Sequence, residues 1–332
     1  VDPRSETSTD PEAAIAWATV IYLSLFPKDL NEVINRFVTK MGPDQLVLEN
    51  SSVKSPVIPA LKSLDEKGVS VISTHPLAKH DQPLRGVKVL VMDVGENSTP
   101  ARDFAEDFYG KSGMIIIRHQ LEQHDEIMAP EQGLPHTLWR AVAKPVADLG
   151  HDPEQLWKLA PANAELSWMA LWRTEIQNPR ISASIINAFA TSPLGTSMID
   201  SIIKNLQELK NTASDEERLR RSFEETYRRL NANGMGERMN ETTTIIVERL
   251  ANLRIGSMIV VASKDEPGVL RDLSTIFAEC GINLTAIDSH VIEDGVKFMI
   301  GKDPQTENAA LDQAKVRLTE SGFKVLGIQK LQ

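Results

Sequence analysis

The stretch QLVLENSSVKSPVIPALKSLDEKGVSVISTHP (residues 45–76) decides the fold of the first part of the chain. Residues 45–52 and 69–76 each contain a short run of apolar and β-branched side chains, and residues 55–68 between them have helical spacing. Runs that are apolar on both faces are typical of parallel strands covered on both sides. The stretch therefore predicts a strand, a crossover helix and a second strand.

The same alternation continues on both sides of this stretch. Residues 19–26 and 88–94 are further apolar runs, and residues 27–42 suit another crossover helix. We expect four parallel strands with intervening helices over residues 1–110. This is an α/β arrangement that corresponds to part of a doubly wound, Rossmann-like sheet domain.

The pattern becomes helical beyond about Gly110. Apolar residues recur at spacings of four from Leu134 to Val146, and strand signals nearly vanish until Ser257. Such spacing indicates helices with one apolar face. We expect an all-helical domain over residues 111–254.

Residues 255–332 predict a third domain. Their order is strand, helix, two strands, helix and strand, which is a ferredoxin-like βαββαβ unit. The segment DEPGVLRDLSTIFAECGINLTAIDS (residues 265–289) resembles the ACT regulatory domain, with an acidic residue, Pro-Gly, an amphipathic helix and Gly-x-Asn before the second strand. The resemblance implies that Asp265, Gly268 and Asn283 bind an effector.

A glycine at position 268 would let this loop approach a ligand, and the amides that open the helix are suited to an amino acid's carboxylate. A tight turn without any ligand is the alternative.

Composition excludes several classes of function. The chain has 36 Lys and Arg against 46 Asp and Glu, a net charge of −10, so duplex nucleic acid and anionic membranes are repelled on average. The apolar run at residues 14–27 is too short to span a bilayer. A single cysteine, Cys280, fits a reducing cytosol. We expect a soluble cytoplasmic protein with neither nucleic-acid nor membrane partners.

Two motifs follow predicted strands. In ENSSVKS (residues 49–55), Ser52 and Lys54 lie at the carboxyl end of a strand, where open parallel sheets bind ligands. In STHP, His75 ends the next strand before Pro76, which forces an extended or turn geometry at the histidine. A lone histidine in this position is more often structural than catalytic.

Two more motifs lie on predicted helices. In QHDEIMAPEQGLPHTLWR (residues 123–140), Gln132 and His136 are four apart on one face. In WMALWRTEIQNPR (residues 168–180), Arg173 precedes a proline by six residues, and its guanidinium suits a carboxylate. The competing interpretation is an arginine that extends along a packed helix. No residue pattern predicts a metal site.

The order and spacing of these four motifs resemble the prephenate/arogenate dehydrogenase family of tyrosine biosynthesis, over Val1 to about Lys210. Some members of that family end in an ACT domain. The resemblance implies oxidative decarboxylation of prephenate to 4-hydroxyphenylpyruvate, or of arogenate to tyrosine, with NAD or with NADP. It also implies that the helical domain forms a homodimer. The effector implied for feedback regulation is an aromatic amino acid, tyrosine.

The resemblance also implies roles for individual residues. His75 matches the catalytic histidine, and Ser52 matches the serine that hydrogen-bonds near the reacting hydroxyl and lies beside the cofactor. Arg173 matches the arginine that holds a substrate carboxylate, while His136 and Gln132 match residues that line the same cleft. Histidine suits the proton-accepting role because its ordinary pKa is near 6.5.

The dinucleotide site is implied only in part. Asp2 resembles the acidic residue that binds the adenosine ribose after the second strand of this family, which favours NAD, and Arg4 could accept the 2′-phosphate of NADP. No G-x-G-x-x-G follows Asp2. We therefore expect the first strand, the glycine-rich loop and the first helix to lie upstream of Val1.

Three positions depart from the family pattern. Lys79 stands where glycine is common, and Glu49 replaces the commoner aspartate. Glu165 stands where some relatives carry a second arginine, so that a carboxylate near the substrate side chain could favour the amino group of arogenate.

Two other functions remain open at this point. One is a non-catalytic amino-acid sensor, which Lys79 and the lack of a glycine loop would favour. The other is a related β-hydroxyacid dehydrogenase, which fits worse because its helical-domain lysine motif is not found. Ser52, His75, His136 and Arg173 together favour the dehydrogenase of prephenate or arogenate.

Overall fold

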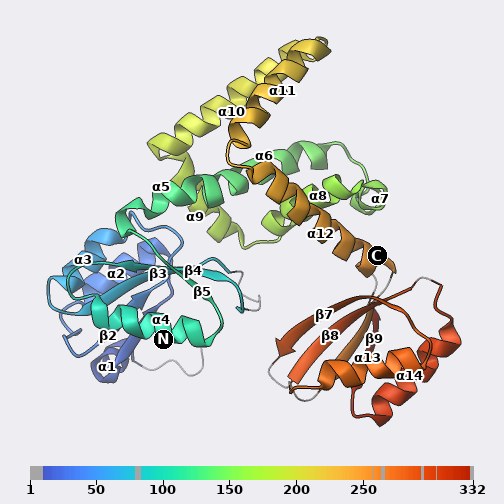
Figure 1. Cartoon of the computed structure of the whole chain (residues 1–332). Helices are drawn as coiled ribbons and strands as arrows, with labels where there is room; N and C mark the ends of the chain where they lie inside the picture. Colours follow the sequence, from blue (N-terminus) through green and yellow to red (C-terminus); the bar gives the residue numbers. More distant parts are fainter. Residues whose placement is uncertain are drawn as a thin grey trace. The chain divides into compact units, whose positions relative to one another are not determined.

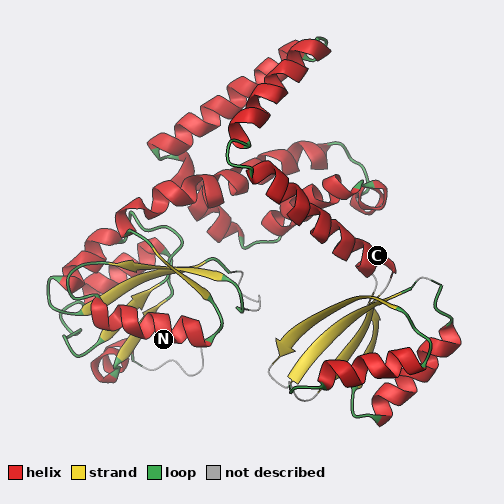
Figure 2. Ribbon diagram, in the orientation of Figure 1, coloured by secondary structure: helices red, strands yellow, loops and turns green. Residues whose placement is uncertain are grey.

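The computed structural model describes residues 10–78, 84–255, 257–262, 266–292, 295–303 and 305–329. The chain divides into two compact units, residues 1–211 and 212–332. Each unit contains one sheet and several helices (Figures 1 and 2). The mixed α/β class, the helical middle region and the antiparallel C-terminal sheet confirm the fold expected from the sequence.

The first unit contains a five-stranded sheet with the order β1-β2-β3-β4-β5. Its strands are β1 (Val20–Leu23), β2 (Leu46–Glu49), β3 (Ser70–Pro76), β4 (Lys88–Asp93) and β5 (Ile115–Arg118). The pairs β1–β2, β2–β3 and β4–β5 are parallel, so the carboxyl ends of β1, β2 and β3 lie at one edge of the sheet.

Two features of this sheet differ from expectation. Strand β4 runs antiparallel to β3, with His75 opposite Leu90. Only eleven residues, 77–87, connect the two strands, which is too few for a crossover helix. Strand β5 was not expected, because its four residues form a short edge strand inside a region that was predicted to be helical. The sheet therefore continues beyond Gly110.

Helices cover both faces of this sheet. They are α1 (Pro11–Trp17), α2 (Pro27–Phe37), α3 (Ile58–Asp65) and α4 (Thr99–Lys111). Adjacent residues of the central strands point to opposite faces: Val47 and Val71 join a cluster with α2 and α3, whereas Leu48 and Ile72 join a cluster with α4. This two-sided burial is what the continuous apolar runs predicted.

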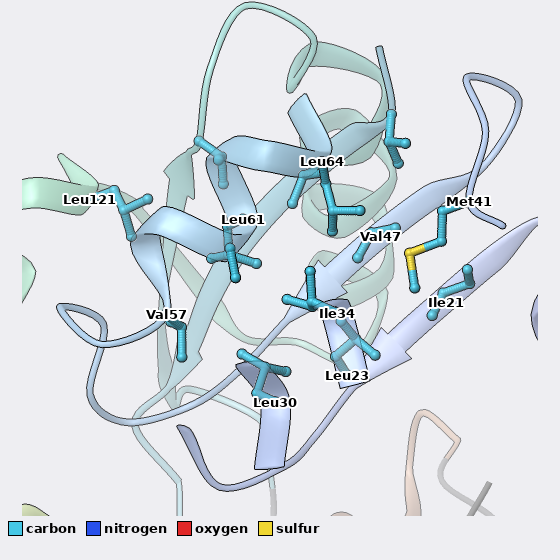
Figure 3. Packing of buried hydrophobic residues seen from close by; sticks show 14 of the residues in the cluster. Ile21, Leu23, Leu30, Ile34, Met41, Val47, Val57, Leu61, Leu64 and Leu121 are labelled. Atoms are coloured by element: carbon cyan, nitrogen blue, oxygen red, sulfur yellow. The ribbon is translucent and has the colours of Figure 1, made fainter. Parts of the chain in front are cut away.

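The larger of these clusters is drawn in Figure 3. Leu30 and Ile34 of α2 and Leu61 and Leu64 of α3 are fully buried in it. Burial of each such side chain contributes about 1.5–3 kcal/mol relative to exposure, as an upper estimate. This core fixes the positions of the strand ends that carry the polar motifs.

The rest of the first unit is helical. A 3₁₀ turn, η1 (Leu121–Gln123), leads into α5 (His124–Met128), a π-helical turn η2 (Ala129–Gly133) and α6 (Leu134–Asp148). It continues with α7 (Pro153–Leu159), α8 (Ala162–Glu175), α9 (Pro179–Ala190) and α10 (Pro193–Thr212). A Cβ atom at position 133 would lie 2.6 Å from Phe189, so Gly133 is what allows α9 to pack closely against η2.

The second unit begins with the helices α11 (Glu216–Leu230) and α12 (Met235–Ile255). It continues with β6 (Ser257–Ala262), α13 (Val269–Glu279), β7 (Leu284–Ile292), β8 (Gly295–Lys302), α14 (Asn308–Glu320) and β9 (Lys324–Gln329). The sheet order is β7-β8-β6-β9, with every neighbouring pair antiparallel. This is the expected βαββαβ unit, and α13 and α14 share its apolar core.

Within the described ranges, the structure contains no helix with the length and apolar character needed to cross a bilayer.

Candidate functional site

A buried ion pair lies where β2 ends. Lys54 and Glu49 are both 0% exposed, and Lys54 Nζ donates to Glu49 Oε2 at 2.8 Å and to the Thr74 carbonyl at 2.8 Å. Glu49 also accepts the Ser51 amide and the Ser73 hydroxyl. Burial lowers the pKa of Lys54, and the adjacent Glu49 carboxylate opposes that change. The pair fixes the Ser-Val-Lys turn against the end of β3.

His75 lies at the end of β3, beside this ion pair. Its side chain is 3% exposed, and its Nδ1 lies 2.9 Å from Nε2 of His124, the first residue of α5. Burial is the main reason that the pKa of His75 is lowered to about 3, and the positive charge of Lys54 lowers it further. His75 is therefore a neutral imidazole at neutral pH.

His124 is fully buried, and its Nδ1 lies 2.7 Å from Oδ1 of Asp125. Asp125 also accepts the amides of Lys54 and Ser55 and the Ser55 hydroxyl, at 2.9, 2.7 and 2.5 Å. Burial alone would raise the pKa of Asp125, but the bonds from His124, Ser55 and the two amides hold it well below its usual range. Asp125 thus connects α5 to the turn after β2 as an ionised carboxylate.

Ser52 occupies the bend between Glu49 and Lys54 and is half-buried. The fold places it at the carboxyl edge of the parallel strands, as expected. Its hydrogen bond to substrate or to His75 stays a prediction.

A second polar cluster joins α6, α8 and α9. Arg140 on α6 donates to Glu175 Oε2 at 2.6 Å, to the Thr174 carbonyl at 2.9 Å and to the Ser182 hydroxyl at 3.3 Å. Arg140 therefore ties α6 to the end of α8, next to Arg173, and to the first turns of α9.

His136 and Arg173, both expected in the substrate site, lie near this cluster. Burial lowers the pKa of His136, and the charges of Arg140 and Arg173 lower it further, so both arginines lie within electrostatic range of this histidine. The His136 Nδ1 atom is buried and has no hydrogen-bond partner among the described residues. Arg173 itself is exposed, and Gln132 is half-buried in η2.

The two clusters lie on one continuous helical stretch, α5 through α6. His124 and His136 are twelve residues apart in sequence, about 18 Å along a helix axis. The structure thus brings His75 together with the Ser-Val-Lys turn, and His136 with Arg173. A common cleft for both sets stays a prediction.

Several expected residues fall outside the described part of the chain. These are Asp2, Arg4, Lys79 and Asp265. The cofactor and effector contacts predicted for Asp2, Arg4 and Asp265, and the effect predicted for Lys79, stay predictions.

The second unit contains a pocket of about 600 Å³ beside Gly268. Its walls come from one side of α13 along its whole length, from residues before this helix and from the turn before β9, and they include Glu266, Arg271 and Phe323. Gly268 has φ +104°, a conformation that favours glycine. Asn283 is exposed and does not line this pocket.

His124 and Asp125 were not predicted as site residues, although their motif was. The available signal was the adjacent pair His-Asp at the start of a helix, in the motif that carried the family resemblance. A hydrogen-bond partner 49 residues away, His75, has no local signature in the sequence.

Comparison with known proteins identifies two segments. Residues 120–225 match the family model of the prephenate dehydrogenase dimerization domain. Residues 257–317 match the model of the ACT domain. These matches cover most of the helical region and most of the βαββαβ unit, and they confirm the resemblance to this dehydrogenase family and to the ACT domain.

Two relatives are similar over larger parts of the chain. A protein of Methanocaldococcus jannaschii, described as a probable arogenate/prephenate dehydrogenase, is 28% identical over 159 residues, which is 46% of this chain and 36% of that protein. The match therefore spans about a third of the length of this curated relative. The prephenate dehydrogenase of Aquifex aeolicus, solved with hydroxyphenyl propionate and NAD+, has the same fold, with a TM-score of 0.51 and 17% identity over 68% of this chain and 81% of that one.

Proposed function

We propose that this chain is a prephenate/arogenate dehydrogenase with an ACT domain, and that it oxidises and decarboxylates prephenate with a nicotinamide dinucleotide. The observation that carries the proposal is the buried, neutral His75 at the edge of the sheet where doubly wound folds bind their ligands. Arogenate, the amino-acid analogue of prephenate, is the alternative substrate.

The described residues fit one end of such a cofactor. Ser52 and His75 lie at the carboxyl edge that would receive the nicotinamide ring. The helix after β1, α2, begins with Pro27 and carries Asp29 in its first turn, and the helix after β2, α3, has Pro59 as its second residue. Neither helix start offers the glycine-rich run of free amides that binds a pyrophosphate. We therefore assign only the nicotinamide side to the described residues.

The proposed reaction requires a proton acceptor. A bound nicotinamide dinucleotide would supply the acceptor for the hydride that leaves the ring carbon bearing the hydroxyl group. His75 accepts the proton of that hydroxyl as the carbonyl forms, since its neutral imidazole has a free lone pair. Loss of carbon dioxide then makes the ring aromatic, and His75 returns the proton to the phenol oxygen. A buried position favours this role because water is excluded from the base.

We propose that Arg173 and His136 bind a carboxylate of the substrate. Arg173 is an exposed guanidinium at the end of α8, and His136 has a buried ring nitrogen without a partner in the described chain. The Arg140–Glu175 pair supports this arrangement because it holds α6 against α8. Gln132, one helical turn before His136, is assigned to the same region.

The choice between prephenate and arogenate depends on what faces the substrate side chain. Glu165 is 5% exposed in the first turn of α8, about 12 Å along the helix from Arg173. Its contact with an amino group of arogenate is a proposal that the two substrates can test directly.

We further propose a homodimer formed by the helical region and feedback by an aromatic amino acid, tyrosine, at the ACT domain. The dimer is supported by large apolar side chains that this chain leaves exposed on α10, among them Ile203 and Leu206. Feedback is supported by the pocket beside Gly268.

The test is reduction of NAD+ and NADP+ with prephenate and with arogenate. Replacing His75 by Asn should lower kcat by roughly 10²- to 10⁴-fold, the usual contribution of a positioned proton acceptor. Arg173→Gln should raise KM by about ten- to a hundredfold, since a charge-assisted bond to a carboxylate is worth roughly 1.5–3 kcal/mol.

Matched controls are available in the same unit. His151→Asn changes an exposed loop histidine, and Arg180→Gln changes an exposed arginine in the first turn of α9. Neither should change kcat or KM more than about twofold. If no combination of cofactor and substrate reacts, yet tyrosine binds the protein, the amino-acid sensor replaces the dehydrogenase.

A further inference from the structure

An unbroken line of polar contacts runs from the proposed proton acceptor into the protein. It begins at His75 Nδ1, passes through both ring nitrogens of His124 and ends at the carboxylate of Asp125, with separations of 2.9 and 2.7 Å. His75 and His124 are both buried. Such a line can be satisfied only if each ring places its proton on one particular nitrogen.

The direction of the line is set by Asp125. This carboxylate accepts three further hydrogen bonds, from the amides of Lys54 and Ser55 and from the Ser55 hydroxyl. An ionised carboxylate with those donors can only accept, so His124 must carry its proton on Nδ1. The lone pair of neutral His124 is then on Nε2, which faces His75.

The same logic determines the state of His75. Because His124 Nε2 accepts, His75 must donate from Nδ1, and its own lone pair is left on Nε2. Both imidazoles are neutral, since burial lowers the pKa of each, and the Lys54 ammonium acts in the same direction. The charges that face the pair are Lys54 and Glu49 from the end of β2 and Asp125 from α5.

We propose that His124 and Asp125 are positioning residues that hold His75 in the tautomer whose Nε2 accepts the substrate hydroxyl proton. The proposal rests on the proposed dehydrogenase function, which assigns His75 as the acceptor. Neither residue touches the substrate in this scheme. Their effect is to orient the ring and to exclude the tautomer that would present an N–H group to the hydroxyl.

The line also provides a place for the positive charge. When His75 Nε2 gains the hydroxyl proton, the proton on His75 Nδ1 can pass to His124 Nε2. His75 thus binds one proton and passes another on, so that His124 becomes the cation, beside the Asp125 carboxylate. The return of the proton when the ring becomes aromatic reverses both movements, so the line begins and ends each turnover unchanged.

The proposal is tested by nitrogen-15 NMR of the imidazole rings in the full chain without substrate. We expect His75 to be protonated on Nδ1 and unprotonated on Nε2, and His124 to be protonated on Nδ1. In Asp125→Asn, the side-chain amide can donate to His124 Nδ1, so both rings should change tautomer. In the same variant kcat should fall by roughly 10²- to 10⁴-fold, with KM changed less than about threefold.

Three controls separate positioning from loss of the fold. Glu126→Gln neutralises the adjacent, exposed acidic residue of α5 and should leave tautomers and kcat unchanged. Ser55→Ala removes one donor to Asp125 and should keep both tautomers, with kcat within about threefold of wild type. His124→Gln breaks the line without changing the charge of Asp125 and should reproduce the loss in kcat.

The outcomes distinguish this inference from the proposed function. A wild-type His75 protonated on Nε2, or an active enzyme whose kcat is unaffected by a tautomer change in Asp125→Asn, overturns the inference alone. Absence of turnover in the wild type with either substrate overturns the proposed function, and the catalytic meaning of the tautomer with it. The expected tautomers together with the loss in kcat support both.

Discussion

At the ends of β2 and β3, the first sheet buries Glu49, Lys54, Ser73, Thr74 and His75, whereas the buried side chains of the second sheet are all apolar in its described residues. Burying a polar or charged group costs free energy unless hydrogen bonds within the protein replace those that the group makes with water. The first sheet meets that cost with a dense set of hydrogen bonds. The second sheet has an apolar core, and the pocket of its unit is lined by α13 and by neighbouring residues that include Glu266 and Phe323.

The comparison indicates where reactivity is built into this protein. A buried polar cluster is rigid and holds its groups in unusual ionisation states, which suits proton transfer. An apolar core with a glycine turn suits reversible binding of a small effector, because a glycine lets the backbone of the turn approach a ligand closely. The predictions that follow test this contrast, beginning with the largest expected effect.

The largest effect is expected from breaking the buried ion pair. Lys54→Met leaves the Glu49 carboxylate buried without its cation and should lower the free energy of unfolding by about 3–5 kcal/mol. Urea unfolding followed by tryptophan fluorescence measures this, because all five tryptophans lie within residues 1–211.

A double variant sharpens the same test. Lys54→Met combined with Glu49→Leu removes both charges and should recover most of the lost stability, since a buried pair contributes little beyond apolar replacements. If Lys54→Met alone unfolds at the wild-type urea concentration, the first sheet does not depend on its polar burial as described.

A smaller effect is expected from pH. The folded pKa of His75 is about 3, below its ordinary value of 6.5, so the unfolded chain binds more protons between these values. The stabilisation is complete above about pH 6.5 and is lost as the pH falls towards 3, by up to about 1.4 kcal/mol per pH unit for one histidine. His124, whose pKa is also lowered, adds to the slope.

The measurement is the urea midpoint of the first unit between pH 7 and pH 5. His75→Asn should reduce the slope of stability against pH by about one proton, whatever it does to stability at pH 7. An unchanged slope in this variant would mean that His75 titrates alike in the folded and unfolded chains.

In the second sheet, the contrast predicts an effect on binding rather than on the core. Gly268→Ala places a Cβ at φ +104° and 3.2 Å from the Arg271 guanidinium, which should cost about 1–2 kcal/mol and weaken tyrosine binding roughly tenfold. Gly281→Ala is the matched control, because Gly281 also has positive φ, +69°, but a Cβ there meets nothing within 4 Å and the residue does not line the pocket.

Isothermal titration calorimetry with tyrosine measures the affinity for the effector, and thermal melts followed by circular dichroism measure the loss of stability. Both variants should melt earlier, and only Gly268→Ala should bind tyrosine less tightly. Equal weakening of tyrosine binding in both variants would place the effector elsewhere.

The smallest effect is expected from an exposed ion pair. On α11, Arg220 contacts Glu217 and Glu224, with all three side chains about half exposed. Solvent screens such pairs, so Arg220→Met should leave the melting temperature within experimental error. A clear drop in melting temperature would show that burial does not explain the different contributions to stability of the Lys54–Glu49 pair and the exposed Arg220 pairs.

Much of the fold could be predicted because its signals are local. The apolar runs predicted β1 to β4, and the order of elements after Ser257 predicted the complete βαββαβ unit. The antiparallel direction of β4 could also have been inferred, since the connection from Pro76 to Lys88 is too short for a crossover. Strand β5 has the β-branched run Ile115–Ile117, but its short length and exposed edge position weaken that signal.

The sequence by itself determined which residue types were available for chemistry and on which element each would lie. His75 at a strand end and the His124–Asp125 pair at a helix start follow from local pattern. Only the tertiary structure decided that these residues meet, because their contact joins positions 49 residues apart. It also decided their ionisation, since a pKa depends on the water and charges excluded or brought near by packing, and no local sequence specifies either.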